Sequence, residues 1–179
     1  FTKTPAAVVA SGATLPFPPG PEDLHHEMEL AFAIGTEVFR GDAATALDAV
    51  YAYGCALDMT RRDLQAAAKD KRRPWSLAKD FEGSAVLAPL TPAAAMGTIG
   101  DQRIWLEVNG TRRQEAQLSD MIHGVAAIIA HLSGFYHLGP GDLVLTGTPA
   151  GVGAVRPGDV LEGGIDGLEP VRLELGAPG

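Results

Sequence analysis

Apolar and polar positions alternate along residues 27–34 of the chain. One set of positions is bulky and apolar and consists of Met28, Leu30, Phe32 and Ile34. The other set carries Glu27 and Glu29, followed by two alanines. A period of two is that of a β-strand, whose successive side chains point to opposite faces. The pattern therefore predicts a strand with one core face and one face that holds two carboxylates beside small side chains.

Two carboxylates on one strand face need a partner. Like charges this close repel each other unless a cation lies between them or one carboxylate takes up a proton. A hard divalent cation satisfies both glutamates at once. The alternative is a solvated edge strand with two exposed acids, and this stretch of sequence leaves both interpretations open.

The neighbouring segments predict short strands and few helices. Residues 1–22 are rich in Pro, Ala and Gly and are expected to form an extended arm. A short helix is expected over residues 42–50, and a strand of small residues over 50–58. Thr60 and Asp63 have the spacing of a capping box, so the next helix is expected to begin there.

The second half of the chain begins with a predicted hairpin. Residues 103–116 alternate in polarity around Asn109–Gly110, a dipeptide typical of hairpin turns. A helix is expected from Ser119, its cap, to Gly134. Short strands between Gly-rich turns follow over residues 138–148, 155–165 and 166–175. Because strands and helices are mixed without a βαβ rhythm, the predicted fold class is α+β with a strand-rich core.

The composition is that of one globular domain over residues 1–179, with 46% hydrophobic and 20% charged residues. The formal net charge of −8 argues against nucleic acid or an anionic membrane as a partner. The single cysteine, Cys55, excludes an internal disulfide and fits a reducing cytoplasm. No apolar run approaches the roughly 20 residues of a membrane-spanning helix.

Three carboxylates are candidate metal ligands. Glu27, Glu29 and Asp58 are accompanied by no histidine or cysteine at zinc spacing, so the set suits Mg²⁺, Mn²⁺ or Ca²⁺. His26 and Glu29 form an HxxE pattern, but on a strand the two side chains face opposite sides and do not form a dyad.

Four further residues are candidates for binding a ligand beside such a metal. Arg62 and Gln65 fall on the same side of the helix that follows Asp58. Lys79 lies in the apolar segment PWSLAKDF, where a purely structural lysine is the alternative. Thr148 lies in TGTPAGVG, a Gly-rich segment that lacks the P-loop pattern and places backbone N–H groups at a strand end.

These segments together resemble the fumarylacetoacetate hydrolase family over nearly the whole chain. The similar stretches are HHEMELAFAIG, YGCALDMTRRDLQ, PWSLAKDF, WLEVNGTRRQ, SDMIHG and PGDLVLTGTPAGVGAVRPGD. Their order and spacing are specific, although each alone is weak. Within the family, FTKTPAAVV, LSGFY and the last of these stretches look closest to fumarylpyruvate hydrolases, and acylpyruvases and oxaloacetate decarboxylases are nearly as similar.

The resemblance implies a mixed β-roll, usually a cytoplasmic homodimer, and assigns roles to the candidate residues. It implies that a divalent metal, Mg²⁺ before Mn²⁺ or Ca²⁺, is held by Glu27, Glu29 and Asp58. It implies that the pyruvoyl group of a small-molecule oxo acid is bound by Arg62, Gln65, Lys79 and Thr148. Lys79 also takes a catalytic role, since it would stabilise negative charge that develops in the reaction.

The reaction implied is hydrolysis of a C–C bond in a 2,4-diketo acid, 3-fumarylpyruvate giving fumarate and pyruvate in gentisate breakdown. Decarboxylation of oxaloacetate and acylpyruvase activity are the alternatives within the family. An alternative of another class is a metal-binding domain without catalysis, which would bind metal and oxalate without turnover.

The sequence departs from the family pattern in two respects. Asp80 follows Lys79 where serine or alanine is commoner, and is expected to alter the hydrogen bonds of the lysine. Family members also begin with a segment that carries an HxxE on a closing loop, and no residue of this chain matches it. We therefore expect a native protein with further residues upstream of Phe1, and the general base of the family maps onto no residue here.

Overall fold

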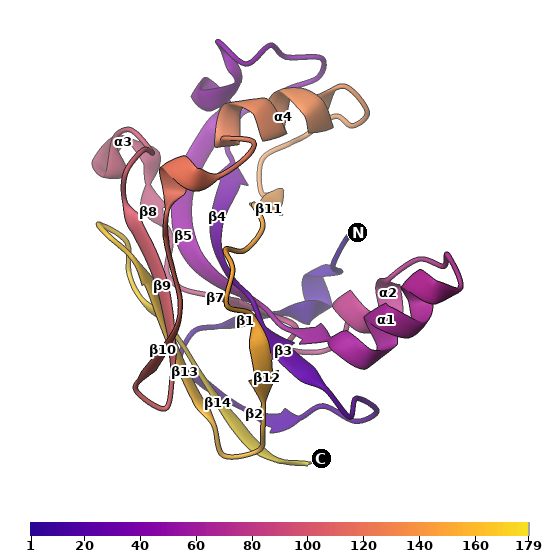
Figure 1. The fold of residues 1–179 in the computed structure, drawn as a ribbon. Coiled ribbons are helices and arrows are strands. Elements are labelled where there is room, and N and C mark those ends of the chain that lie inside the picture. Colours follow the sequence, from indigo (N-terminus) through magenta and orange to yellow (C-terminus); the bar gives the residue numbers. More distant parts are fainter. Residues whose placement is uncertain (179) are drawn as a thin grey trace.

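The computed structural model describes residues 1–178, which form three β-sheets with short helices at their edges (Figure 1). The largest sheet has the strand order β1-β7-β5-β4-β11, with β8 paired to β5. Its strands are β1 (Val8–Ala10), β4 (Met28–Ile34), β5 (Val50–Asp58), β7 (Ala85–Leu87), β8 (Thr91–Pro92) and β11 (Leu143–Leu145). Because β4 lies between β5 and β11, the alternative of a solvated edge strand is wrong.

The second sheet has the order β10-β9-β13-β14-β2 and forms the wall at the left of Figure 1. Its strands are β2 (Ala13–Phe17), β9 (Arg103–Val108), β10 (Thr111–Gln117), β13 (Val160–Ile165) and β14 (Val171–Pro178). The predicted hairpin is confirmed, since β9 and β10 pair antiparallel around Asn109 and Gly110, both with positive φ. A third, small sheet joins β3 (Leu24–His26), β6 (Thr60–Arg61) and β12 (Gly153–Val155).

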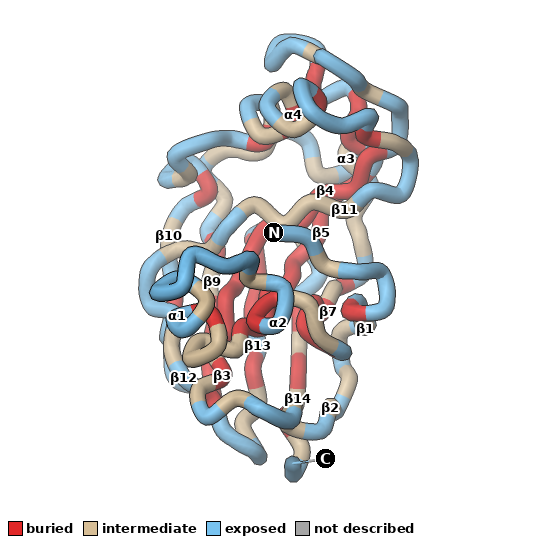
Figure 2. The backbone as a smooth tube through the Cα atoms, turned by 90° about the vertical axis from the view of Figure 1, so that its right-hand side faces the viewer, coloured by how far each residue is buried: buried red, intermediate tan, exposed pale blue. Residues whose placement is uncertain are grey.

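The apolar face of β4 forms the centre of the core, as its alternation predicts. Met28, Leu30, Phe32 and Ile34 are all buried, and they pack in one cluster with apolar side chains of the second sheet. In Figure 2 the buried residues follow β4 and β5 through the middle of the molecule, while exposed residues gather at the helices. The predicted strand-rich α+β fold, with mixed parallel and antiparallel pairs, is therefore confirmed.

The helices are short and lie outside the sheets. They are α1 (Arg62–Asp70), α2 (Ser76–Lys79), α3 (Ala93–Met96) and α4 (Val125–Ser133), with 3₁₀ turns η1 (Pro5–Ala7), η2 (Ala46–Ala49) and η3 (Leu118–Asp120). Helices α1 and α2 lie together on one side of the molecule near the N-terminus, and α4 lies at one end (Figure 1). None of the helices in residues 1–178 has the length and apolar character needed to cross a membrane.

Several local predictions are wrong. Residues 1–22 form strands β1 and β2 instead of a free arm, because both find parallel partners from distant segments. The helix expected over 42–50 is reduced to a single 3₁₀ turn.

Both predicted helix caps are also wrong. Arg61 stands at the N-cap of α1, and the Thr60 hydroxyl donates to the Asp58 carbonyl instead of capping the helix. Gly124 precedes α4, while Ser119 belongs to η3. Strand pairing and tertiary contacts, and not the local capping signals, set the N-terminal ends of α1 and α4.

Candidate functional site

The three predicted metal ligands meet at one point, where β4 begins and β5 ends. The antiparallel register brings the Asp58 backbone N–H to the Glu27 carbonyl at 2.8 Å, and Glu29 points to the same side of the sheet. One carboxylate oxygen from each of Glu27, Glu29 and Asp58 lies within 4.8 Å of the others. All three residues are buried. The strand period, which places Glu27 and Glu29 on one face, is what makes this convergence possible.

The carboxylate set fits a hard divalent cation. All the donors are oxygens, the ligand type that Mg²⁺, Mn²⁺ and Ca²⁺ prefer. Asp58 Oδ1 is buried, and its charged partner is the Lys3 ammonium at 2.8 Å. Burial, and then the nearby charge of Asp58, raise the pKa of Glu29 to about 8. A divalent cation at this point would relieve the repulsion that disfavours ionisation of Glu29.

Lys79 bridges two of these carboxylates from the end of α2. Its Nζ donates to Glu27 Oε2 at 2.8 Å, to Asp58 Oδ2 at 2.6 Å and to the Thr60 hydroxyl at 2.7 Å. An ammonium group has three protons, so Lys79 is fully satisfied and can turn a proton toward a ligand only by releasing a partner. The residue is therefore part of the site, and its partners are polar although its segment is apolar in sequence.

The pKa values of Glu27 and Asp58 are shifted in opposite directions. Burial opposes ionisation of Glu27, but Lys79 and then Arg62 outweigh it and lower its pKa. For Asp58, burial dominates and the pKa is raised despite Lys3 and Lys79.

Lys3 is a member of the site that the sequence did not reveal. Its Nζ lies 2.8 Å from Asp58 Oδ1 and donates to the Ser84 hydroxyl at 3.0 Å and to the Lys79 carbonyl. Burial lowers the pKa of Lys3. The chain reaches this point because η1 and β1 dock beside β7, whereas the sequence predicted only an extended arm.

Arg62 and Gln65 lie on the site side of α1, as predicted. Arg62 donates to Glu27 Oε1 at 2.5 Å, to Gln65 Oε1 at 2.6 Å and to His25 Nδ1 at 3.3 Å. A guanidinium has five N–H donors, so two remain for a ligand carboxylate. Since Arg62 occupies the oxygen of Gln65, the amide NH₂ is the end of Gln65 that can donate to a ligand.

Thr148 reaches the site on the loop after β11. Its hydroxyl donates to the Met28 carbonyl at 2.7 Å, between the two glutamate positions of β4. The preceding Gly147 N–H donates to Glu29 Oε2 at 2.7 Å. The loop therefore holds one of the carboxylates as well as presenting Thr148.

Gln114 of β10 is a second buried residue that the sequence did not identify. Its amide contacts Thr148, Met28 and His26, and it is 1% exposed. Cross-strand partners in a hairpin share a face, so a correct register for β10 would have placed Gln114 toward the core. The sequence does not give that register.

Other predicted details differ from the structure. Asp80 does not contact the Lys79 ammonium, because its Oδ1 accepts from the Thr4 N–H at 2.8 Å and from the Thr4 hydroxyl. Arg61, in turn, places its guanidinium carbon 4.2 Å from the centroid of the Phe81 ring.

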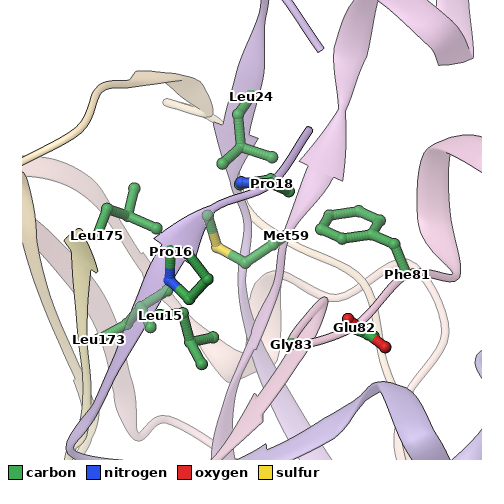
Figure 3. Close-up of a pocket in the computed structure, with 10 residues that line it drawn as sticks. All are labelled: Leu15, Pro16, Pro18, Leu24, Met59, Phe81, Glu82, Gly83, Leu173 and Leu175. Atoms are coloured by element: carbon green, nitrogen blue, oxygen red, sulfur yellow. The ribbon is translucent and has the colours of Figure 1, made fainter. Parts of the chain in front are cut away.

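Two hollows lie near this region. The smaller one, of about 20 Å³, lies beside Met59 and is lined mainly by apolar side chains (Figure 3). The larger one, of about 640 Å³, opens beside the N-terminus and is lined by Phe1, Thr2, Arg73, Pro74, Trp75, Ser76, Leu132 and Tyr136. The Phe1 ring connects it to the site, since its centroid lies 4.7 Å from Lys79 Nζ.

Comparison with known proteins identifies relatives that match nearly the whole chain. The chain is 46% identical to a fumarylpyruvate hydrolase of a Ralstonia species, over 98% of this chain and 91% of that protein. It is 41% identical to the mitochondrial oxaloacetate tautomerase of Rattus norvegicus, over 98% of this chain and 79% of that protein.

A solved structure is also similar. The fumarylpyruvate hydrolase of Pseudomonas aeruginosa, crystallised with Mn²⁺ and pyruvate, superposes with a TM-score of 0.94 at 40% identity. The alignment covers 99% of this chain and 78% of that chain.

The family model for the C-terminal region of fumarylacetoacetate hydrolase matches residues 1–175. This match spans both large sheets and every predicted ligand of the site. The chain therefore belongs to the fumarylacetoacetate hydrolase family, as its sequence motifs indicated, and is an enzyme similar to fumarylpyruvate hydrolases.

Proposed function

We propose that residues 1–179 act as one catalytic domain that hydrolyses a C–C bond of a 2,4-diketo acid. The observation that carries this proposal is the convergence of Glu27, Glu29 and Asp58 beside an arginine with free donors. A bound divalent cation would supply Lewis acidity and a fixed point for the oxygens of an oxo acid. We propose Mg²⁺ as the native ion, and the relative crystallised with Mn²⁺ and pyruvate supports a divalent ion of this kind.

The side chains around the carboxylates divide the work. Arg62 would bind the ligand carboxylate through its two remaining N–H groups, since charge-assisted hydrogen bonds are the strong ones. Gln65 would add an amide donor from the same helix. Lys79 would stabilise negative charge as it develops on the oxo oxygen, from a buried position where electrostatic interactions are strong. Thr148 would face the ligand from the opposite loop and bind it through a water, since its own proton goes to the Met28 carbonyl.

The bond changes are those of a retro-Claisen hydrolysis. Water adds to the carbonyl carbon beyond the CH₂ group. The C–C bond between that carbon and the CH₂ group then breaks, and its electron pair stays on the pyruvoyl unit. The leaving enolate takes up a proton and becomes pyruvate, and the acyl part leaves as a carboxylic acid. With 3-fumarylpyruvate the products are fumarate and pyruvate.

We propose fumarylpyruvate as the substrate because the larger hollow beside Lys79 carries a cation. Arg73 is the one charged side chain in the lining of that hollow, as far as residues 1–178 form it. Fumarylpyruvate has a second carboxylate at the far end of its acyl group, whereas acetylpyruvate has none. The Arg73 cation in this hollow is therefore a means of selecting a dicarboxylate.

Action on oxaloacetate is the second candidate, because relatives 41% identical or less are named oxaloacetate tautomerases. Oxaloacetate offers the same pyruvoyl oxygens and forms the same enolate. A purified enzyme that cleaves fumarylpyruvate faster than acetylpyruvate or oxaloacetate supports the first proposal. Faster turnover of oxaloacetate replaces it with the second.

The ligand clamp has its own test. Arg62→Ala removes a charged partner from a partly buried site, so we expect oxalate to bind the Mn²⁺-loaded protein about 2–5 kcal/mol more weakly by calorimetry. Lys69→Ala, exposed and two turns further along the same helix, is the matched control. Equal oxalate affinity in the two variants would remove Arg62 from the clamp.

We further propose a cytoplasmic homodimer that acts in the breakdown of aromatic compounds. The family resemblance supports the assembly, the compartment and the pathway. The exposed rings of Phe135 and Tyr136 after α4, 71% and 62% accessible, support the assembly. Sedimentation of the purified protein tests the assembly. A monomer at micromolar concentration contradicts it.

A further inference from the structure

Gln114 joins the two elements that form the site. Its Oε1 accepts from the Met28 N–H at 3.1 Å and from His26 Nδ1 at 3.0 Å. Its Nε2 donates to the Thr148 hydroxyl at 2.7 Å and to the Pro149 carbonyl at 2.9 Å. One side-chain amide thus connects the start of β4 to the loop after β11. The contacts with Met28 and His26 are buried and those with Thr148 and Pro149 are part-buried, so the β4 side of the network is the better shielded from competing water.

The backbone partners of Gln114 identify which atom of its side-chain amide is the oxygen and which is the nitrogen. The Met28 N–H can only donate, so the atom that faces it is the oxygen. The Pro149 carbonyl can only accept, so the atom that faces it is the nitrogen. The Thr148 hydroxyl must therefore accept from Gln114, and its own proton goes to the Met28 carbonyl. A ligand or water at Thr148 meets only the remaining lone pair of that hydroxyl.

A β-bulge places Gln114 inside the protein. The hairpin register pairs Arg112 with Glu107, and a regular ladder would then pair Arg113 with Leu106. Instead the register shifts, and Gln114 pairs with Leu106. Bulges commonly re-aim a side chain next to an active site. Without this bulge the arginine would face the core and the glutamine would face solvent.

The loop that Gln114 holds also holds a metal-ligand candidate. The Thr146 N–H and hydroxyl both reach the Leu30 carbonyl at 3.0 Å, and the Gly147 N–H reaches Glu29 Oε2. On its other side, Gly151 packs against the bulge, where a Cβ would lie 2.1 Å from the Arg113 carbonyl oxygen. The loop is thus clamped between β4 and β10.

We propose that Gln114 is a positioning residue of the site. It holds the Thr146–Pro149 loop on β4, keeps the Gly147 N–H on Glu29, and fixes the Thr148 hydroxyl as a hydrogen-bond acceptor, which can accept a hydrogen bond from a bound water but not from the oxygens of an oxo acid. The proposal rests on the proposed function only in taking an oxo acid or its analogue as the ligand. Gln114 itself contacts neither metal nor substrate.

A double-mutant cycle tests whether Gln114 acts through Thr148. The variants are Gln114→Glu, which keeps the acceptor and loses the donor, Thr148→Val, and the two combined. We expect each single variant to bind oxalate roughly 10–100-fold more weakly in the Mn²⁺-loaded protein, the range for residues that orient ligands of a metal. The double variant should be no weaker than the weaker single one. If the fold-losses of oxalate affinity in the two single variants multiply in the double variant, the two residues act independently and the proposal is overturned.

Metal binding gives a readout that does not depend on the substrate. Gln114→Met keeps the volume and removes both hydrogen-bonding ends without adding charge. We expect Mn²⁺ to bind this variant about 10-fold more weakly, since the loop that fixes Glu29 is released. Gln117→Met, on the same strand and exposed, should bind Mn²⁺ like the wild type. Wild-type Mn²⁺ affinity in Gln114→Met would overturn the proposal.

The binding tests of Gln114 can be read whether or not the proposed hydrolase function is correct. Absence of hydrolysis in the wild-type protein would remove the hydrolase assignment and leave both binding measurements readable. If Gln114→Glu does not fold, the cycle is run with Gln114→Met in its place, and loss of coupling to Thr148→Val contradicts the proposal in the same way.

Discussion

The ammonium of Lys3 lies 2.8 Å from Asp58 Oδ1, a buried oxygen of the three-carboxylate cluster. A cation of the N-terminal segment thus faces the point where a divalent metal fits. The same contact neutralises a buried carboxylate when no metal is bound and opposes a metal when one approaches, because like charges repel.

Lys3→Met separates these two effects. We expect Mn²⁺ to bind the variant several-fold more tightly by calorimetry, since a competing charge is gone. We also expect the free energy of unfolding of the chelator-treated variant to fall by about 1–3 kcal/mol, because a buried carboxylate loses a partner. Lys69→Met, on exposed helix surface, should change neither quantity. Weaker Mn²⁺ binding in Lys3→Met would mean that Lys3 orders the site instead of competing for it.

The stability of the metal-free protein should depend on pH through Glu29. Burial and the charge of Asp58 raise the pKa of Glu29 from its ordinary value of 4.5 to about 8. A pKa that is raised in the folded state contributes stability that is complete below about 4.5 and is lost as pH rises through about 8. We therefore expect Tm of the chelator-treated protein to fall between pH 5.5 and pH 8.5.

Glu29→Gln is the control for this pH dependence. It cannot ionise, so its Tm should fall less over the same interval, and metal should no longer restore stability at the higher pH. Identical pH profiles for the two proteins would show that Glu29 does not carry the effect.

Arg73 should decide between substrates with and without a second carboxylate. We expect Arg73→Ala to raise KM for fumarylpyruvate roughly tenfold or more and to leave KM for acetylpyruvate unchanged, since only the former offers a distal carboxylate. Steady-state assays with both substrates measure this, and Arg72→Ala, one residue earlier, is the matched control. A parallel change for both substrates would place the distal carboxylate elsewhere.

Gly151 should tolerate no side chain. Its φ is +100°, and a Cβ would meet the Arg113 carbonyl oxygen at 2.1 Å, so Gly151→Ala must move the loop or the bulge. Gly158 has a φ of +90° with open space around the added Cβ and isolates the cost of backbone strain. We expect Gly158→Ala to cost about 1 kcal/mol of stability and Gly151→Ala about 2–4 kcal/mol, with weaker Mn²⁺ binding only in the latter. Denaturant unfolding gives the two values, and equal costs would contradict the close approach.

The sequence by itself determined the central strand and identified the three candidate metal ligands. The period of two over residues 27–34 separates a core face from the face of Glu27 and Glu29, and no tertiary information is needed to read it. Asp58, at the end of the next predicted strand, was the third candidate carboxylate, and the family resemblance implied that the three hold one metal; the antiparallel pairing of β4 and β5 brings them together. The Asn109–Gly110 hairpin was equally local, since its turn requires positive φ.

Only the tertiary structure decided which side chains complete the site. Lys3 reaches Asp58 because β1 finds a parallel partner in β7, a long-range pairing without a local signal. Gln114 faces inward because a bulge shifts the register of β10 by one residue, and a shift of one exchanges the two faces of a strand. The local capping signals at Thr60 and Ser119 were overridden by strand pairing and packing for the same physical reason. A contact between distant segments depends on how the whole chain folds, whereas the apolar–polar period of a strand can be read from neighbouring residues alone.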